Sequence, residues 1–188
     1  MPLTNFLVPT YMQMLRALSG WLDKAQKQIP DADAEALLSA RLAPDMYPLS
    51  TQVRFAALQA QEATFRLRGE PFPAALEQLR SEGRNAGEAP GSMADAQARI
   101  GETLTLLGDL GSDALDAGVD RAITIEIPGG MIFDMTGEQY ARDWALAQFY
   151  FHLTMAYAIL RSQGIELGKA DYVPHMFAYL RPGSMPQG

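Results

Sequence analysis

Cysteine is absent from the 188-residue chain. Disulfide bonds, a thiolate nucleophile, iron–sulfur clusters and cysteine zinc sites are therefore excluded for this chain. Basic residues are also in the minority, because 15 Lys and Arg stand against 22 Asp and Glu, which gives a formal net charge of −7. Nucleic acids present a negatively charged backbone that attracts basic proteins. The charge balance therefore predicts that nucleic acid is not a partner.

A segment able to cross a membrane is missing as well. The longest uncharged stretch in the second half of the chain, 144–160, includes Gln148, His152 and Thr154. It is also shorter than the roughly 20 residues that span a bilayer as a helix. The first basic residue is Arg16, so the N-terminus lacks the basic start of a secretory signal. We therefore expect no membrane partner and a cytoplasmic location.

Helical periodicity dominates what is present. Apolar residues recur at spacings of three and four in the segments 11–29, 48–68, 93–107 and 137–163. Such spacing places apolar side chains on one face of a helix, which can then be buried against other helices. The length is typical of one domain, so we expect a single domain over 1–188. The predicted architecture is a four-helix bundle.

The strongest strand signal lies just before the last helical segment. Isoleucines occupy alternate positions over 123–127, and apolar residues alternate again over 131–135 after a Pro-Gly-Gly turn. This pattern predicts a β-hairpin over 123–135. The predicted fold class is therefore all-α in the main, a four-helix bundle with a small β-hairpin insertion.

Burial can also be predicted from the pattern. The last helix is apolar around almost its whole circumference, so we expect it at the centre of the bundle. A short helix is expected over 74–81, and the tail 166–188 is expected to pack and to fray beyond Pro182. Sevenfold spacing on the second helix predicts a solvated outer face made by Arg54, Gln61 and Arg68.

Candidate site residues gather on the last helix. Gln148 and His152 are four residues apart, so their side chains point to the same side. Two interpretations are open: a core histidine bonded to a neighbouring helix, or a ligand-binding cleft. The cleft would lie between the second and last helices, with Asp45 or Gln52 beside His152. Tyr157 completes the candidate ligand-binding residues.

A metal centre is not predicted. The chain has 2 histidines, His152 and His175, whereas a catalytic zinc site uses about three protein ligands. Carboxylates such as Asp45 or Glu62 would have to supply the others. We therefore expect no metal cofactor, and His152 would be a ligand if a divalent metal binds.

Two segments, within 45–53 and 149–172, resemble a bacterial family of domains of unknown function in the DinB/YfiT-like superfamily. The resemblance extends over nearly the whole chain, and it implies a DinB-like bundle without an assigned activity. The matching residues are Asp45-Met46-Tyr47-Pro48-Leu49 with Gln52-Val53, and Phe149-Tyr150-Phe151-His152, Thr154, Ala156-Tyr157, Ile159-Leu160-Arg161, Gly164, Glu166, Gly168-Lys169 and Asp171-Tyr172.

The resemblance also bears on function. Metal-binding members of that superfamily use three histidines, one on the second helix and an H-x-x-x-H pair on a later helix, and some transfer groups to low-molecular-weight thiols. The corresponding residues here are Gln52 or Val53, His152 and Ala156, so the metal triad is incomplete. We therefore expect a non-catalytic homodimer that binds a small molecule. The alternative is a metal-dependent transferase of the DinB type that uses His152 with carboxylates.

Overall fold

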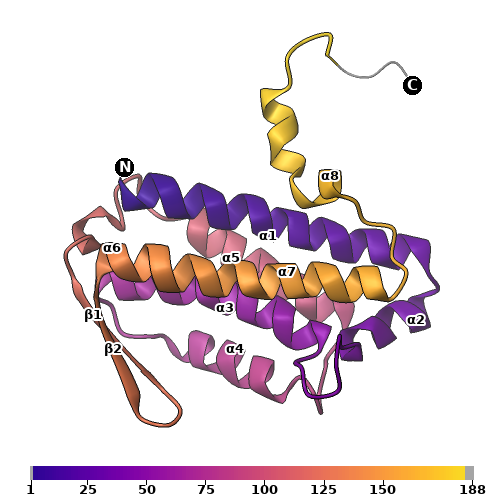
Figure 1. The fold of residues 1–188 in the computed structure, drawn as a ribbon, viewed down its shortest axis with the longest axis horizontal. Coiled ribbons are helices and arrows are strands. Elements are labelled where there is room, and N and C mark those ends of the chain that lie inside the picture. Colours follow the sequence, from indigo (N-terminus) through magenta and orange to yellow (C-terminus); the bar gives the residue numbers. More distant parts are fainter. Residues whose placement is uncertain (1, 185–188) are drawn as a thin grey trace.

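A computed structural model of the chain describes residues 2–184 (Figure 1). Its four longest helices are α1 (Leu3–Gln28), α3 (Leu49–Arg68), α5 (Met93–Gly108) and α7 (Leu146–Ser162). Helix α3 packs against α5 and α7, and α1 packs against the same two helices. The four helices therefore form a bundle, and the prediction of a mainly helical fold is confirmed.

The bundle is closed by large side chains on α1 and small ones on α3. Tyr11 and Trp21 of α1 are among the largest fully buried side chains, whereas α3 contributes Ala56, Ala60 and Ala63 to the core. Small residues let neighbouring helices approach closely. Each buried Å² of apolar surface contributes about 25 cal/mol, so this core is the main source of stability.

The predicted hairpin is also confirmed. Strands β1 (Ala122–Ile127) and β2 (Met131–Thr136) pair antiparallel, with Ile123 opposite Met135. The side chain of Ile123 faces the core, while most of β2 is exposed. The hairpin is therefore held mainly through one face of β1, with Met135 of β2 also packed against the core, as expected for a sheet too small to be stable alone.

The last helical segment includes a stretch of π-helix that the sequence pattern does not predict. Short helix α6 (Gly137–Gln139) opens with a capping box between Thr136 and Gln139, and the backbone of Tyr140–Ala145 then forms a π-helix that continues into α7. The predicted helical range 137–163 is therefore right, although its winding is not uniform. Single π-turns of this kind occur frequently at functional sites.

The predicted solvated face of α3 is wrong for Arg54 and Gln61, whereas Arg68 is partly exposed. Helix α4 (Ala74–Asn85) is longer than the predicted 74–81 and covers that face, so the Arg54 side chain is only 4% exposed. Gln61 is buried as well. Leu76 and Leu79 of α4 form a buried apolar cluster with Ala57, Leu58 and Phe65 of α3, and Gln61 donates to the Thr103 hydroxyl of α5 at 2.7 Å.

Helix α7 is less buried than predicted, because a four-helix bundle leaves each helix one outer side. Its outer side carries exposed Ala147 and Phe151, and the Phe151 residue is 52% exposed. Among the described residues, none of the helices is both long enough and apolar enough to cross a membrane.

The expected packing of the tail holds only at its root. Helix α8 (Lys169–Tyr172) lies against α1, whereas the following 3₁₀ helix (Pro174–Tyr179) points away from the bundle (Figure 1). Tyr179 is 80% exposed. Part of the region predicted to fray beyond Pro182, residues 185–188, lies outside the described residues.

The remaining helical turns connect these elements. Helix α2 (Asp31–Ala36) and the 3₁₀ turn Leu37–Ser39 cross one end of the bundle after α1, and a second 3₁₀ turn (Asp116–Gly118) precedes the hairpin. Thr4 of α1 donates hydrogen bonds to the Asp116 carboxylate from its amide (2.8 Å) and its hydroxyl (2.7 Å). These bonds anchor the N-terminus of α1 beside the hairpin.

Candidate functional site

His152 of α7 and Gln52 of α3 meet at the packed interface between the two helices. The distance from His152 Nδ1 to Gln52 Oε1 is 2.9 Å, and both residues are buried. His152 is 7% exposed, so a small part of the residue reaches the surface. The bond joins residues 100 positions apart in the chain. It agrees with both sequence interpretations, a histidine tied to a neighbouring helix and a ligand-binding histidine.

A chain of hydrogen bonds determines which nitrogen of His152 carries the proton. Gln52 donates from Nε2 to the main-chain carbonyl of Tyr47 at 3.2 Å. A carbonyl can only accept, so the amide oxygen of Gln52 must face His152. Nδ1 of His152 is then the donor, and Nε2 carries the free lone pair. Among the described residues, Gln52 is the hydrogen-bonding partner of this ring.

Burial also keeps His152 uncharged. Loss of solvation lowers the pKa of His152 to about 4. At neutral pH the imidazole is therefore neutral, with Nε2 available as a hydrogen-bond acceptor or a metal ligand.

Aromatic rings surround this imidazole. The ring of Phe55 on α3 lies edge-on to His152 with centroids 5.2 Å apart, and Phe151 lies on its other side at 5.3 Å. Tyr47 extends the cluster through an edge contact with Phe55 at 5.7 Å. Sequence reasoning missed Phe55 as a site residue, although its place one turn after Gln52 puts it on the same side of α3.

Gln148 and Asp45, two other candidate residues, are not part of the His152–Gln52 pair. Gln148 is half-buried one turn before His152 on the same side of α7. Asp45 is exposed in the turn that precedes α3, where the Met46 amide bonds the Ala43 carbonyl at 3.0 Å. The structure therefore pairs His152 with Gln52, the second of the two residues named as alternatives.

Tyr157 belongs to a different cluster, which anchors the tail. Its hydroxyl donates to the Leu167 carbonyl at 3.2 Å, and its ring makes edge contacts with Trp21 and Tyr172. Trp21 stacks on Tyr172 and donates from Nε1 to the Asp171 carbonyl at 2.7 Å. Tyr157 therefore holds the root of the tail on α1.

The residues around His152 do not fit a metal centre. The described residues contain no group of three or more His, Asp, Glu or Cys side chains arranged to hold a metal ion. Glu62, one of the two carboxylates considered as ligands, is bound by Arg66 at 2.7 Å and by Arg80 at 3.2 Å. Ala156, one turn after His152, is buried and has no ligating atom.

A second polar cluster surrounds Glu62 beneath the hairpin. The hydroxyl of Tyr140, which starts the π-helix, is buried and has no hydrogen-bonding partner among the described residues. Burial, together with the charge of Glu62, raises the pKa of Tyr140 well above its ordinary value. Arg66 also lines an open hollow of about 360 Å³ with Phe72 and Arg121. Sequence periodicity gave no sign of this cluster.

A family described as "Domain of unknown function (DUF1993)" matches residues 3–173. The chain belongs to the DUF1993 family. A crystal structure of a DinB family member protein from Shewanella denitrificans is similar to this DUF1993 chain, with 31% sequence identity and a TM-score of 0.70. The similarity covers 99% of this chain and 94% of the Shewanella chain. The resemblance drawn from the sequence, including the DinB-like fold, is therefore confirmed. No curated protein matches the chain.

Proposed function

We propose that this DUF1993 protein binds a small neutral molecule at His152 without catalysing a reaction on it. The observation that carries the proposal is the hydrogen bond from His152 Nδ1 to the amide oxygen of Gln52, because it makes Nδ1 the donor and leaves Nε2 as a fixed acceptor. Among the described residues Gln52 is the hydrogen-bonding partner of the ring, on Nδ1, and the 7% exposure of His152 leaves a small part of the residue accessible to a ligand.

The surroundings select the chemistry of the ligand. A neutral Nε2 accepts a hydrogen bond from a hydroxyl or an N–H group. The rings of Phe55 and Phe151 favour an apolar or aromatic body. We therefore propose a ligand of phenol type, with one donor group on an apolar frame, and we place Gln148 as a neighbouring polar contact.

NMR of the imidazole nitrogens tests this proposal. The chain has 2 histidines, so ¹⁵N-histidine labelling gives two rings, and His175→Asn assigns them. Phenol at millimolar concentration should change the ¹⁵N chemical shift of His152 Nε2 and leave the ¹⁵N chemical shifts of His175 unchanged. Toluene, which has the same ring without a hydrogen-bond donor, should change the ¹⁵N chemical shift of Nε2 much less. Equal responses of the two histidines, or no response to phenol, would contradict the proposal.

The alternative function is a metal-dependent transferase that uses His152 with carboxylates. It requires stoichiometric zinc, nickel or iron in untagged protein, measured by elemental analysis. Our proposal expects far less than one metal ion per chain, and the same content in wild type and His152→Ala. A stoichiometric metal that is lost in His152→Ala would support the transferase instead.

We also propose that the protein is a homodimer. Related bundles commonly pair, and the strand β2 leaves apolar Met131, Ile132 and Phe133 exposed in the described structure. Light scattering at tens of micromolar should give twice the mass of the chain, which is 20.6 kDa.

A further inference from the structure

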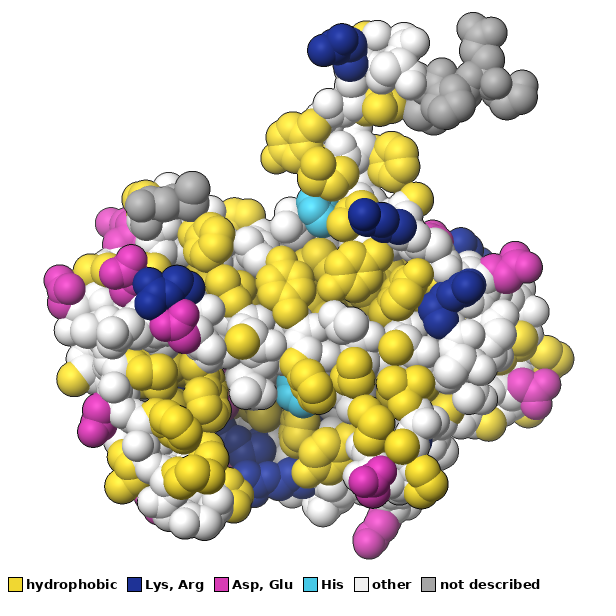
Figure 2. Space-filling model, in the orientation of Figure 1, with side chains coloured by type: hydrophobic (Ala, Val, Ile, Leu, Met, Phe, Trp, Pro, Cys, Tyr) yellow, Lys and Arg dark blue, Asp and Glu magenta, His cyan; other side chains and the backbone are white. Residues whose placement is uncertain are grey.

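The outer face of the bundle formed by α1 and α7 is unusually poor in charge. Residues 144–160, which include most of α7, contain no charged side chain, and neither do residues 3–15 of α1. Phe6 and Phe151 are exposed on these two helices. Figure 2 shows the result, a central region of hydrophobic and uncharged polar surface with charged side chains mostly around it. Large exposed apolar patches on soluble proteins commonly mark interaction sites.

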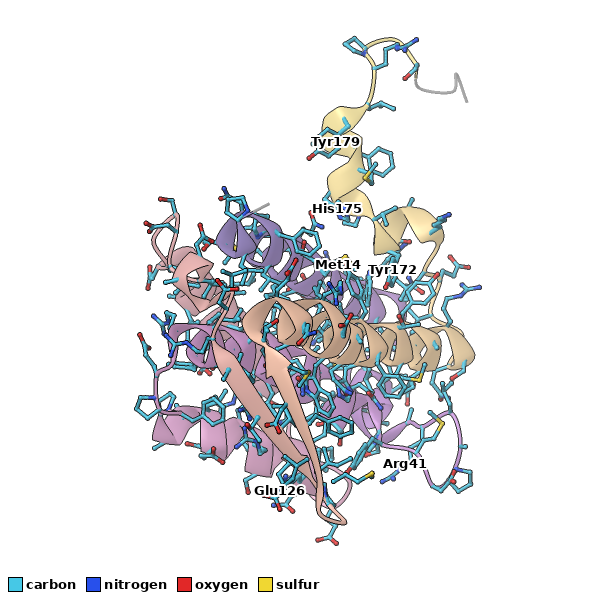
Figure 3. The ribbon with its side chains drawn as sticks, turned by 60° about the vertical axis from the view of Figure 1, so that its left-hand side comes forward. Met14, Arg41, Glu126, Tyr172, His175 and Tyr179 are labelled. Carbon is cyan, nitrogen blue, oxygen red and sulfur yellow. The ribbon has the colours of Figure 1, made fainter. Side chains whose placement is uncertain are left out.

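The tail beyond α8 has the same character. Residues 172–180 carry no Asp, Glu, Lys or Arg. The exposed apolar residues of this segment are Met176, Phe177, Tyr179 and Leu180. In Figure 3, His175 lies near the bundle and Tyr179 lies well beyond it. Pro174 and Phe177 border a hollow of about 450 Å³ over Ala17 and Gly20 of α1, whereas Tyr179, which is 80% exposed, presents its ring to water.

The root of the tail directs it away from its own bundle. Asp171 accepts from Lys24 at 3.1 Å and from the Gly168 amide at 2.8 Å, while its carbonyl accepts from Trp21. These bonds, together with the stacked rings of Trp21 and Tyr172, fix α8 against α1. Because the root is held in this way, the tail projects from its own bundle. A surface on another molecule is therefore better placed to cover it.

A second copy of the chain fits that requirement. Each copy carries a net charge of −7, so two copies repel unless they meet through uncharged surfaces. Residues 3–15 of α1, residues 144–160 and residues 172–180 of the tail are free of charged side chains and rich in apolar ones. In a dimer with twofold symmetry, the tail of each copy would contact the α1–α7 face of the other. The same apolar area is then buried twice, and both tails are covered.

We propose that two copies exchange their C-terminal arms, with residues 173–184 of each lying across the α1–α7 face of the other. This inference rests on the proposed homodimer and adds the surfaces through which it forms. It predicts that Phe151 and Tyr179 become buried in the dimer. Pairing through the exposed edge of β2 is the competing arrangement, and the test below separates the two.

Cross-linking tests the exchange directly, because the chain has no cysteine of its own. Ala147→Cys places a thiol on the exposed side of α7, and Ala178→Cys places one on the tail. The two single-cysteine chains, with different tags, are co-expressed and treated with a short bismaleimide. The control pairs Ala178→Cys with Ser81→Cys, an exposed position on α4. We expect at least tenfold more tag-to-tag product from the Ala147 pair than from the control pair.

Equal yields from the two pairs would overturn the exchange. A double variant with both cysteines on one chain gives a further check. If it forms an internal link while the co-expressed single variants form none, the tail lies on its own bundle and the proposal fails.

Light scattering separates this proposal from the homodimer on which it rests. Replacing Phe177 and Tyr179 together by Ser should weaken the dimer at least tenfold, whereas Arg181→Ser, a polar change in the same tail, should not. A dimer that persists unchanged in the Phe177→Ser/Tyr179→Ser variant overturns the exchange and leaves the homodimer in place. A monomeric wild type overturns both.

Discussion

The ring of Phe55 occupies the space that a Cβ atom on Gly83 would need. An ideal Cβ at Gly83 would lie 2.4 Å from Cε1 of Phe55, and the Gly83 carbonyl is held by the Thr51 hydroxyl at 2.9 Å. The α4 backbone therefore cannot easily retreat, and the ring that would have to move rests on His152. Gly83 thus couples the packing of α4 to the candidate site.

Replacing Gly83 by Ala should destabilise the protein, although Ala is the better helix former. We expect a loss of about 1–2 kcal/mol from overpacking, measured by urea unfolding. Gly20→Ala is the matched control, because Gly20 is an exposed glycine within α1 with no atom within 4 Å of its added Cβ. It should stabilise by up to about 1 kcal/mol. Equal effects of the two substitutions would show that Phe55 moves aside freely.

The low pKa of His152 makes stability depend on pH. The folded-state pKa is about 4, against an ordinary value of 6.5, so between these values the unfolded chain takes up a proton that the folded chain refuses. No stability is lost to this residue above pH 6.5. The loss grows as the pH falls toward 4, to about 3 kcal/mol.

The measurement compares the unfolding free energy of wild type and His152→Gln at pH 7 and pH 4.5. We expect the variant to lose less stability than wild type over this interval. Parallel losses in both proteins would show that His152 protonates in the folded state near its ordinary pKa. Such a result would also remove the argument for a neutral Nε2.

Arg54 and Glu82 should respond unequally to substitution. Arg54 Nε lies 3.8 Å from Glu82 Oε2, and Arg54 is nearly buried while the Glu82 side chain is 29% exposed and also binds Arg99. Removing the arginine leaves Glu82 with another partner. Removing the carboxylate leaves a buried guanidinium whose pKa is already lowered by burial.

We therefore expect Arg54→Met to stay within about 1 kcal/mol of wild type, and Glu82→Gln to cost about 2 kcal/mol or more. Urea unfolding at neutral pH measures both. Glu102→Gln is the control, because it removes only the more exposed partner of Arg99 and should cost less than about 1 kcal/mol. A larger loss in Arg54→Met than in Glu82→Gln would reverse this interpretation.

The sequence anticipates several residues of the candidate site, but not the hydrogen bonds that connect them. The spacing of Gln148 and His152 predicts that both lie on one side of the last helix, and Gln52 is one of the two neighbours that the sequence proposes for His152. The role of Tyr47 could not be anticipated, because it acts through its main-chain carbonyl, which any residue would supply. Tyr157 looked similar to the site residues in the sequence, yet it packs with Trp21.

The burial of Arg54 is likewise a feature of the fold that local sequence does not predict. Its sevenfold spacing with Gln61 is typical of a solvated helix face, and nothing local distinguishes it from one. The docking of α4, through Leu76 and Leu79, and the contact of Gln61 with Thr103 of α5 turn that face into an interior. The tail differs in the opposite direction, because packing is predicted over 166–188 and Phe177 is exposed.

Local patterns are enough to predict the helices and the hairpin, because their signals depend on spacings of two, three or four residues along the chain. The hairpin over 123–135 and the long helix from 137 follow from such local patterns. The tertiary structure decided which polar groups are buried and which nitrogen of His152 carries a proton. These properties depend on contacts such as that between Gln52 and His152, which lie 100 residues apart. Desolvation and hydrogen bonding act between neighbours in space, so the order of residues alone does not contain them.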